Sequence, residues 1–278
     1  MRWCAPADRI IPGAPSAITS STAVDADYPL ANLHDGDPTS PTRWTTAAAA
    51  RIVWDLGGGS PSVTIEGLLV VVHTLYEGQT LTVQGNATNA WGAPAFSQAI
   101  TIGAYQGGLP NNVLVDLRAT TLATLGYRYV SLLLPDHVTG GHAIGEVCWI
   151  SRWTAPSVSA GWPVQRSDVR RISVNATSYG VAHVIDRGVR QRRLRLHFAA
   201  LSDADRALWL ALVREAGASL PWVLVLDVDP TTDFAASAEA LYVRFAPEAI
   251  GALEESLIYY GLTDLDIDLL EVQRGLAL

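Results

Sequence analysis

Three aspartates near the end of the chain have the spacing closest to a catalytic or metal-binding arrangement. Asp264, Asp266 and Asp268 alternate with apolar residues at positions 265, 267 and 269. Alternate residues of a β-strand lie on one face, about 7 Å apart, so this spacing predicts a row of three carboxylates. Such a row could serve a glycan-cleaving enzyme or bind a metal ion. The simpler interpretation, which we favour, is a strand face that contacts solvent or a partner.

Other patterns of enzyme chemistry are absent from the sequence. It contains no Gly-x-Ser-x-Gly turn, no phosphate-binding loop and no dinucleotide-binding glycine pattern. None of its six histidines is followed by another at the fourth position, and no Cys-x-x-Cys occurs, so a zinc site is not expected. The histidines are His34, His73, His137, His142, His183 and His197. We therefore predict a protein that is not an enzyme and requires no cofactor.

The charge balance excludes further classes of partner. Among 278 residues, 27 are acidic and 19 basic, giving a formal net charge of −8. Nucleic-acid binding depends largely on neutralising phosphates, so we expect no nucleic-acid partner.

The apolar runs are too short to span a bilayer, so no membrane insertion is expected. The N-terminus lacks the apolar segment of a secretory signal, and reduced thiols are therefore expected for Cys4 and Cys148.

The elements that position these residues are predicted to be mostly β-strands. Hydrophobic residues make up 49% of the chain, enough for a sizeable core, and Thr, Val, Trp, Tyr, Gly and Pro are plentiful. In residues 1–153, short apolar runs between turns predict a β-sandwich or jelly roll. Its strands are expected at residues 51–56, 63–73, 80–85, 127–134 and 143–150. Pro, Ser, Ala and Gly then predict a linker at residues 154–163, so we expect residues 1–153 to fold alone.

Residues 164–278 are predicted to form a β-rich domain with one packed helix. Ser202 as N-cap, Asp205 three residues later and Gly217 at the end predict a helix at about residues 203–216. Its apolar stripe is expected at Leu208, Trp209, Leu212 and Val213. Strands are expected at residues 170–176, 179–186, 193–198, 222–227, 241–245, 256–260 and 265–272.

The first half resembles the discoidin or galactose-binding-like family, the coagulation-factor C-type jelly rolls. The similarity rests on five segments in the family's order: residues 28–37 (YPLANLHDGD), 42–44 (TRW), 52–57 (IVWDLG), 127–132 (YRYVSL) and 143–147 (AIGEV). It covers residues 1–153. Independently of the resemblance, the large side chains of Trp44 and Trp54 are expected to supply core area beside the first strands. In extracellular members a disulfide often joins the two ends of the domain, which here correspond to Cys4 and Cys148. We expect adjacent thiols at this pair, with a bridge as the alternative.

The same resemblance implies candidate binding residues. Many such domains hold a structural calcium ion, and the matching positions here are Asp35, Asp37, Thr42 and Glu146. The insertion of residues 38–41 departs from the family's usual spacing, and the alternative is a turn in which the aspartates cap backbone amides. Sugar-binding members use aromatic residues in loops, which points to Tyr76, Trp91 and Tyr105. The alternative, which we favour, is that these aromatics pack against a neighbouring domain or partner.

The second half resembles tail proteins of long-tailed bacteriophages. The similarity lies in residues 201–206 (LSDADR), the following helix, residues 220–227 (LPWVLVLD) and the closing segment 260–272. It implies a structural virion protein of a phage tail tip or baseplate, a distal-tail-like ring component that carries a carbohydrate-binding-like module. Its partners would then be other copies of itself, other tail proteins and a host surface glycan, and it would be in the host cytoplasm during assembly. A free bacterial carbohydrate-binding protein is the first alternative and a glycan-cleaving enzyme the second.

The charge of the second half is strongly polarised along the sequence. Residues 154–200 contain eight arginines and two acids, whereas residues 201–278 contain four arginines and fourteen acids. Arg193 and Arg195 are expected on the strand face opposite Leu194 and Leu196. We hypothesise that this basic face contacts the face formed by the three aspartates in the next copy of a ring. The alternative is that the two faces pair within one chain.

Overall fold

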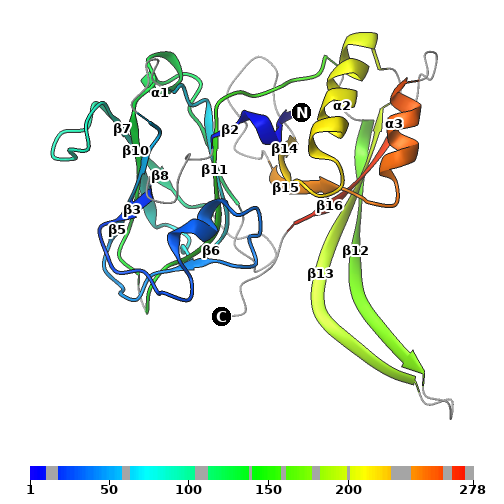
Figure 1. The fold of residues 1–278 in the computed structure, drawn as a ribbon, viewed down its shortest axis with the longest axis horizontal. Helices are drawn as coiled ribbons and strands as arrows, with labels where there is room; N and C mark the ends of the chain where they lie inside the picture. Colours follow the sequence, from blue (N-terminus) through cyan, green and yellow to red (C-terminus); the bar gives the residue numbers. More distant parts are fainter. Residues whose placement is uncertain are drawn as a thin grey trace.

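The computed structural model describes residues 1–10, 18–57, 63–103, 112–137, 140–157, 161–176, 182–198, 201–226, 239–258 and 265–272. Tyr105 and Asp264 lie outside these ranges. The prediction of a mainly β protein is confirmed: Figure 1 shows a β-sandwich beside a second sheet that carries helices. No described helix is long and apolar enough to cross a membrane.

Two antiparallel sheets form the predicted sandwich. One has the strand order β3-β5-β10-β7-β8; the other has the order β2-β11-β6-β9, with β4 paired to β11. The strands are β2 (Arg9–Ile10), β3 (Ile18–Ser20), β4 (Thr42–Arg43), β5 (Ala50–Asp55), β6 (Gly67–His73), β7 (Thr80–Asn86), β8 (Phe96–Thr101), β9 (Val113–Asp116), β10 (Tyr129–Leu134) and β11 (Ala143–Ile150). Short helical turns connect them: η1 (Pro6–Asp8), η3 (Leu30–His34) and α1 (Thr121–Thr124).

The sandwich core lies between these two sheets. Strand alternation directs Ile52 and Trp54 of β5 inward, where both are fully buried. Trp54 meets Trp149 of the opposite sheet edge-to-face, with ring centroids 5.2 Å apart. Trp44 is also buried, so the predicted core positions of Trp44 and Trp54 are confirmed.

The second half forms a six-stranded sheet that includes the N-terminus of the chain. Its order is β1-β14-β15-β16-β13-β12. The strands are β1 (Arg2–Cys4), β12 (Gly161–Ala176), β13 (Ala182–Phe198), β14 (Trp222–Leu226), β15 (Glu239–Phe245) and β16 (Leu265–Glu271). We expected residues 1–153 to belong to the sandwich throughout, but β1 pairs with residues 223–225 of β14. Strand β12 begins at Gly161, inside the predicted linker.

One helix of this half is confirmed and a second was missed. Helix α2 (Asp203–Ala216) begins at Ser202, whose hydroxyl accepts a hydrogen bond from the Asp205 amide, and ends at Gly217 with φ +54°. The predicted stripe holds for Trp209, Leu212 and Val213 but is wrong for Leu208, which is exposed. The strand predicted at residues 256–260 is wrong where the structure describes it, because helix α3 (Ile250–Ile258) packs against α2.

The two halves are joined by an apolar interface between sheets. Buried side chains of β6 and β11 and buried side chains of β14 and β15 belong to one cluster, in which Cys4 and Cys148 are free thiols. The residues include Leu69, Val71, Ile150, Val223, Val225 and Tyr242. Because this face of the sandwich is covered by the second sheet, a fragment of residues 1–153 would expose it. Independent folding of that fragment stays a prediction.

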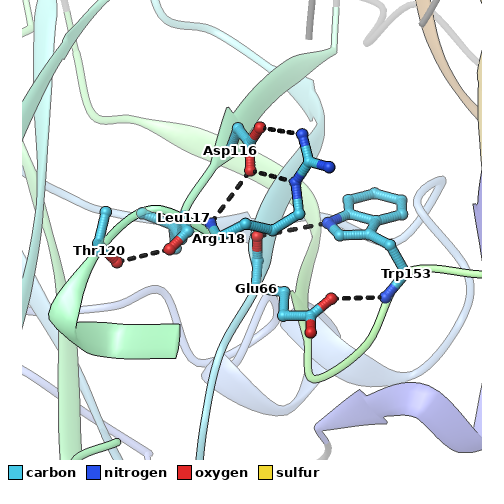
Figure 2. Close-up of polar contacts among 6 residues, drawn as sticks. All are labelled: Glu66, Asp116, Leu117, Arg118, Thr120 and Trp153. Carbon is cyan, nitrogen blue, oxygen red and sulfur yellow. Dashed lines mark hydrogen bonds and ion pairs between the residues drawn. The ribbon is translucent and has the colours of Figure 1, made fainter. Parts of the chain in front are cut away.

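The chain is anchored where it leaves the sandwich. The backbone amide of Trp153 donates to the Glu66 carboxylate over 2.9 Å, and its indole nitrogen donates to the Glu66 carbonyl over 3.3 Å (Figure 2). The indole lies so close to Gly67 that a Cβ there would be 2.8 Å from the ring. At the adjoining end of β9, Arg118 holds Asp116 through two side-chain hydrogen bonds of 2.9 and 2.5 Å. Polar contacts therefore fix this exit from the sandwich.

A long two-stranded ribbon extends from the second sheet. Strand β13 pairs with β16 only at residues 193–198, whereas its pairing with β12 continues to Ala176 and Ala182. Residues 182–192 of β13 therefore pair with β12 alone among the described strands, and Figure 1 shows this part of the ribbon reaching well past the other elements. An isolated two-stranded ribbon is only marginally stable in water, so this arm is suited to contact another surface.

Candidate functional site

An exposed tyrosine and two buried histidines lie together at the end of the sandwich where β6 and β10 finish. The segment after β6 carries Tyr76, and the segment after β10 carries Asp136 and His137 and leads to His142. Tyr76 is 39% exposed, whereas both imidazoles are buried. We call Tyr76, His137 and His142 the loop-end cluster.

The rings of the loop-end cluster contact one another in sequence. The Tyr76 and His137 ring centroids are 5.1 Å apart, and those of His137 and His142 are 4.9 Å apart at a nearly perpendicular angle. Tyr76 therefore presents a ring to solvent while its neighbours support it from within the protein. An exposed ring held in this way can stack on an apolar surface of a ligand.

Hydrogen bonds to the backbone hold the two segments in place. The His142 Nε2 lies 2.6 Å from the Pro135 carbonyl, and the His137 amide donates to the Ala47 carbonyl over 2.7 Å. The Gln79 side chain accepts from the Tyr76 amide and donates to the Asp136 carbonyl, each over 2.8 Å. The ring of Tyr76 is thus carried on a segment tied at several points to its neighbour.

The protonation state of His142 follows from its surroundings. A carbonyl can only accept, so Nε2 must carry the proton that it shares with Pro135. Burial, and secondarily the nearby His137, lower the pKa of His142 and keep the ring neutral. Its Nδ1 has no hydrogen-bond partner among the described residues. The cluster therefore combines an exposed aromatic ring with the buried, uncharged imidazole of His142.

Of the three aromatics named from sequence, the structure places two, in different surroundings. Tyr76 lies in the loop-end cluster, and Trp91 lies on the connection between β7 and β8. The guanidinium of Arg51 is 5.2 Å from the centroid of the Trp91 ring. Tyr105 is outside the described ranges. The sequence did not single out His137 or His142 as site residues, because their spacing matches no helical metal motif and their proximity arises from the loop.

The residues predicted to hold calcium do not form a cation site in this structure. The Glu146 carboxylate is fully buried and bonded to the Arg9 guanidinium and the Gly36 amide. Asp35 accepts from the Asp37 amide over 2.8 Å, and Asp37 accepts from the amide and hydroxyl of Thr39. The Thr42 hydroxyl donates to the Pro29 carbonyl. Among the described residues, no group of three His, Cys, Asp or Glu could hold a metal ion.

The arrangement instead matches the alternative in which the aspartates cap backbone amides of a turn. Arg9 lies beside Glu146, the carboxylate that was expected to bind calcium. The guanidinium supplies the positive charge that Glu146 needs, so a cation there would be repelled. Burial raises the pKa of Glu146, and the Arg9 guanidinium opposes this rise and favours the ionised carboxylate. No local pattern points to Arg9 as the partner of Glu146, since the two residues are 137 positions apart.

A chelator experiment tests the calcium prediction directly. Because arginine and backbone amides already satisfy these carboxylates, we expect EDTA to leave the thermal midpoint unchanged. A calcium ion present at a hundred times its dissociation constant would add about 2.7 kcal/mol of stability. A fall in the midpoint on chelation, restored by added calcium, would contradict our interpretation of the turn.

The charged strand faces of the second half meet within one chain. Arg195 contacts Asp266 over 2.6 Å and Arg193 contacts Asp268 over 3.1 Å, across the paired strands β13 and β16. His197 also lies 2.9 Å from Asp266. Side-chain hydrogen bonds, first from Arg195, lower the pKa of Asp266. These residues therefore pair within one chain, as in the alternative interpretation, and the intersubunit role stays a hypothesis. Asp264 lies outside the described residues.

Comparison with solved structures finds carbohydrate-binding modules that are similar to about half of this chain. No protein-family model matches the chain, and no curated protein matches it. A Streptococcus pneumoniae fucose binding module shares 18% identity, with 49% of this chain and 93% of that chain covered and a TM-score of 0.35. A family 62 carbohydrate-binding module from Clostridium thermocellum shares 18% identity, covering 53% and 99%, at a TM-score of 0.37. A family 32 module from C. perfringens, solved with galactose, shares 12% identity, covering 55% and 100%, at 0.36.

Proposed function

We propose that this chain is a non-enzymatic carbohydrate-binding protein that holds a glycan at the loop-end cluster. The observation that carries the proposal is the Tyr76 ring, exposed at the end of a rigid sandwich and supported by His137. The apolar face of a sugar stacks on such a ring, and neighbouring polar groups orient its hydroxyls. The backbone ties of both segments reduce the entropy that binding must overcome.

Substitution of Tyr76 tests this site. In titrations with galactose- and fucose-terminated oligosaccharides chosen from a glycan array, we expect Tyr76→Ala to weaken binding at least tenfold, or about 1.4 kcal/mol. Tyr76→Phe keeps the ring and should retain most of the affinity. Leu125→Ala, at a residue that is 64% exposed beside α1, is the matched control and should change nothing. Equal affinity for Tyr76→Ala and the unmodified protein would exclude the loop-end cluster as the site.

We also propose, as the second candidate, an assembly role at the distal end of a phage tail, with the sandwich as its adhesion module. The observation in its favour is the β12–β13 ribbon, which extends beyond the sheet and is suited to contact another subunit or tail protein. Mass spectrometry and electron microscopy of purified particles would test it. Absence of the protein from intact tails would leave the free carbohydrate-binding protein.

A further inference from the structure

A second polar surface lies on the outer face of the sheet β3-β5-β10-β7-β8, away from the core. Arg51 of β5 points to this face, because its neighbours Ala50 and Ile52 are buried in the core. Its Nη1 donates to the Gln84 side-chain oxygen on β7 over 2.5 Å. The Ser131 hydroxyl on β10 donates to the same oxygen over 3.3 Å. These bonds orient the amide and hold the guanidinium at a fixed place on the sheet.

The aromatic ring of Trp91 fixes Arg51 from a second direction. The guanidinium carbon is 5.2 Å from the ring centroid, within range of a cation–π interaction. The indole nitrogen donates to the Asn89 side chain over 2.7 Å, which restrains the ring. The guanidinium is therefore held by an amide on one side and an indole on the other before any ligand arrives.

No carboxylate balances the charge of Arg51 in the part of the chain that the structure describes. Burial lowers the pKa of this guanidinium, and no neighbouring acid opposes that effect. A guanidinium has five N–H donors, and only Nη1 of Arg51 has an acceptor among the described residues. Its Nε and Nη2 groups form the edge that binds a carboxylate through two parallel hydrogen bonds.

Arg128, the residue directly before β10 of the same sheet, shows the contrasting arrangement. It also lies over an aromatic ring, with 4.7 Å from its guanidinium carbon to the Tyr129 centroid. Its Nε and Nη2, however, donate to Asp55 over 2.9 and 2.8 Å. Hydrogen bonding to Asp55 raises the pKa of Arg128. Arg51 thus contacts an aromatic ring as Arg128 does, but no described carboxylate accepts from its Nε and Nη2 groups.

We infer that Arg51, Gln84 and Trp91 form a binding site for a carboxylated sugar, such as a uronic acid unit of a glycan. The guanidinium edge would bind the carboxylate, and the exposed Ser97 hydroxyl would donate to or accept from ring hydroxyls. The Gln84 amide nitrogen lies 3.5 Å from Ser97, whereas Ser131 is buried and holds the Gln84 side chain in place. This inference extends the proposed glycan binding to a charged ligand class and to a surface other than the loop-end cluster.

Nuclear magnetic resonance titration of the full chain with glucuronate tests the site, since the Arg51 Nε–H signal reports on that residue alone. We expect glucuronate to shift this signal, and glucose and methyl glucuronate ester to leave it unchanged. Arg51→Gln should weaken glucuronate binding at least tenfold, and Arg51→Lys, which keeps the charge without the planar fork, should bind more weakly than the unmodified protein. Arg128→Gln is the matched control and should bind normally.

Three results would overturn the inference. The first is equal binding of glucuronate and its methyl ester, and the second is a loss of glucuronate affinity with Arg128→Gln equal to that with Arg51→Gln. The third is binding of acetate as tight as that of glucuronate, which would leave a simple anion site. The variant Tyr76→Ala distinguishes a failure of the Arg51 site from a failure of the proposed function. Binding of neutral glycans that depends on Tyr76, without glucuronate binding, would remove only the Arg51 site. Glucuronate binding that depends on Arg51, without any effect of Tyr76→Ala, would remove only the loop-end cluster.

Discussion

Replacing Arg9 with methionine is expected to lower the free energy of unfolding by about 3–5 kcal/mol, the usual cost of leaving one member of a buried ion pair without its partner. The side chains of Arg9 and Glu146 are only 6% and 0% exposed. Arg9 Nη1 also donates to the Tyr242 hydroxyl over 2.6 Å. Because Tyr242 belongs to β15 and Glu146 to β11, the arginine connects the sandwich to the second sheet.

Urea unfolding of a small set of variants measures this effect. Arg128→Met removes an exposed ion pair with Asp55 and should change stability little, because exposed pairs are screened by solvent. The double variant Arg9→Met with Glu146→Leu should recover part of the loss, since no buried charge is then left alone. A loss for Arg9→Met no greater than that for Arg128→Met would show that this network does not join the two halves.

Short-range signals explain which elements the sequence predicted well. The bounds of α2 follow from Ser202, Asp205 and Gly217, all within one turn of its ends. Helix α3 was missed because the residues from Ser256 onward favour strands. Its helical form depends on burying Leu253 and Leu257, four residues apart, in the core shared with α2. That burial depends on tertiary packing that the local pattern does not contain.

Long-range pairings account for the parts of the site and fold that the sequence could not supply. Three residues of β1 contain no signal for a partner at residues 223–225. Tyr76 was chosen as an exposed aromatic, but its support by His137 depends on two loops that are distant in sequence. Glu146 could act as a calcium ligand or as a member of an ion pair, depending on the charge beside it. The structure places Arg9 there, 137 residues away in the sequence, so Glu146 forms an ion pair.

The second large effect is expected from Gly141→Ala, which would disturb the loop that carries His142. A Cβ at Gly141 would lie 1.6 Å from the carbonyl oxygen of Trp44, a backbone atom that cannot rotate away. The same two segments are joined by the Trp44 amide donating to the His142 carbonyl over 2.9 Å. Relieving the overlap requires the loop to move, and we expect a loss of about 3 kcal/mol or more.

Gly92→Ala provides the matched control for this prediction. A Cβ at Gly92 would have nothing within 4 Å, so the substitution should be neutral or slightly stabilising through the unfolded state. Thermal unfolding of both variants compares the two glycines, and titration with a neutral glycan compares the loop-end cluster in each. Because the overlap lies between the loop and the strand segment beneath it, Gly141→Ala should weaken glycan binding as well as stability. Equal midpoints for the two variants would mean that the loop accommodates the methyl group, and the close approach of Gly141 to Trp44 would then have no role in shaping the site.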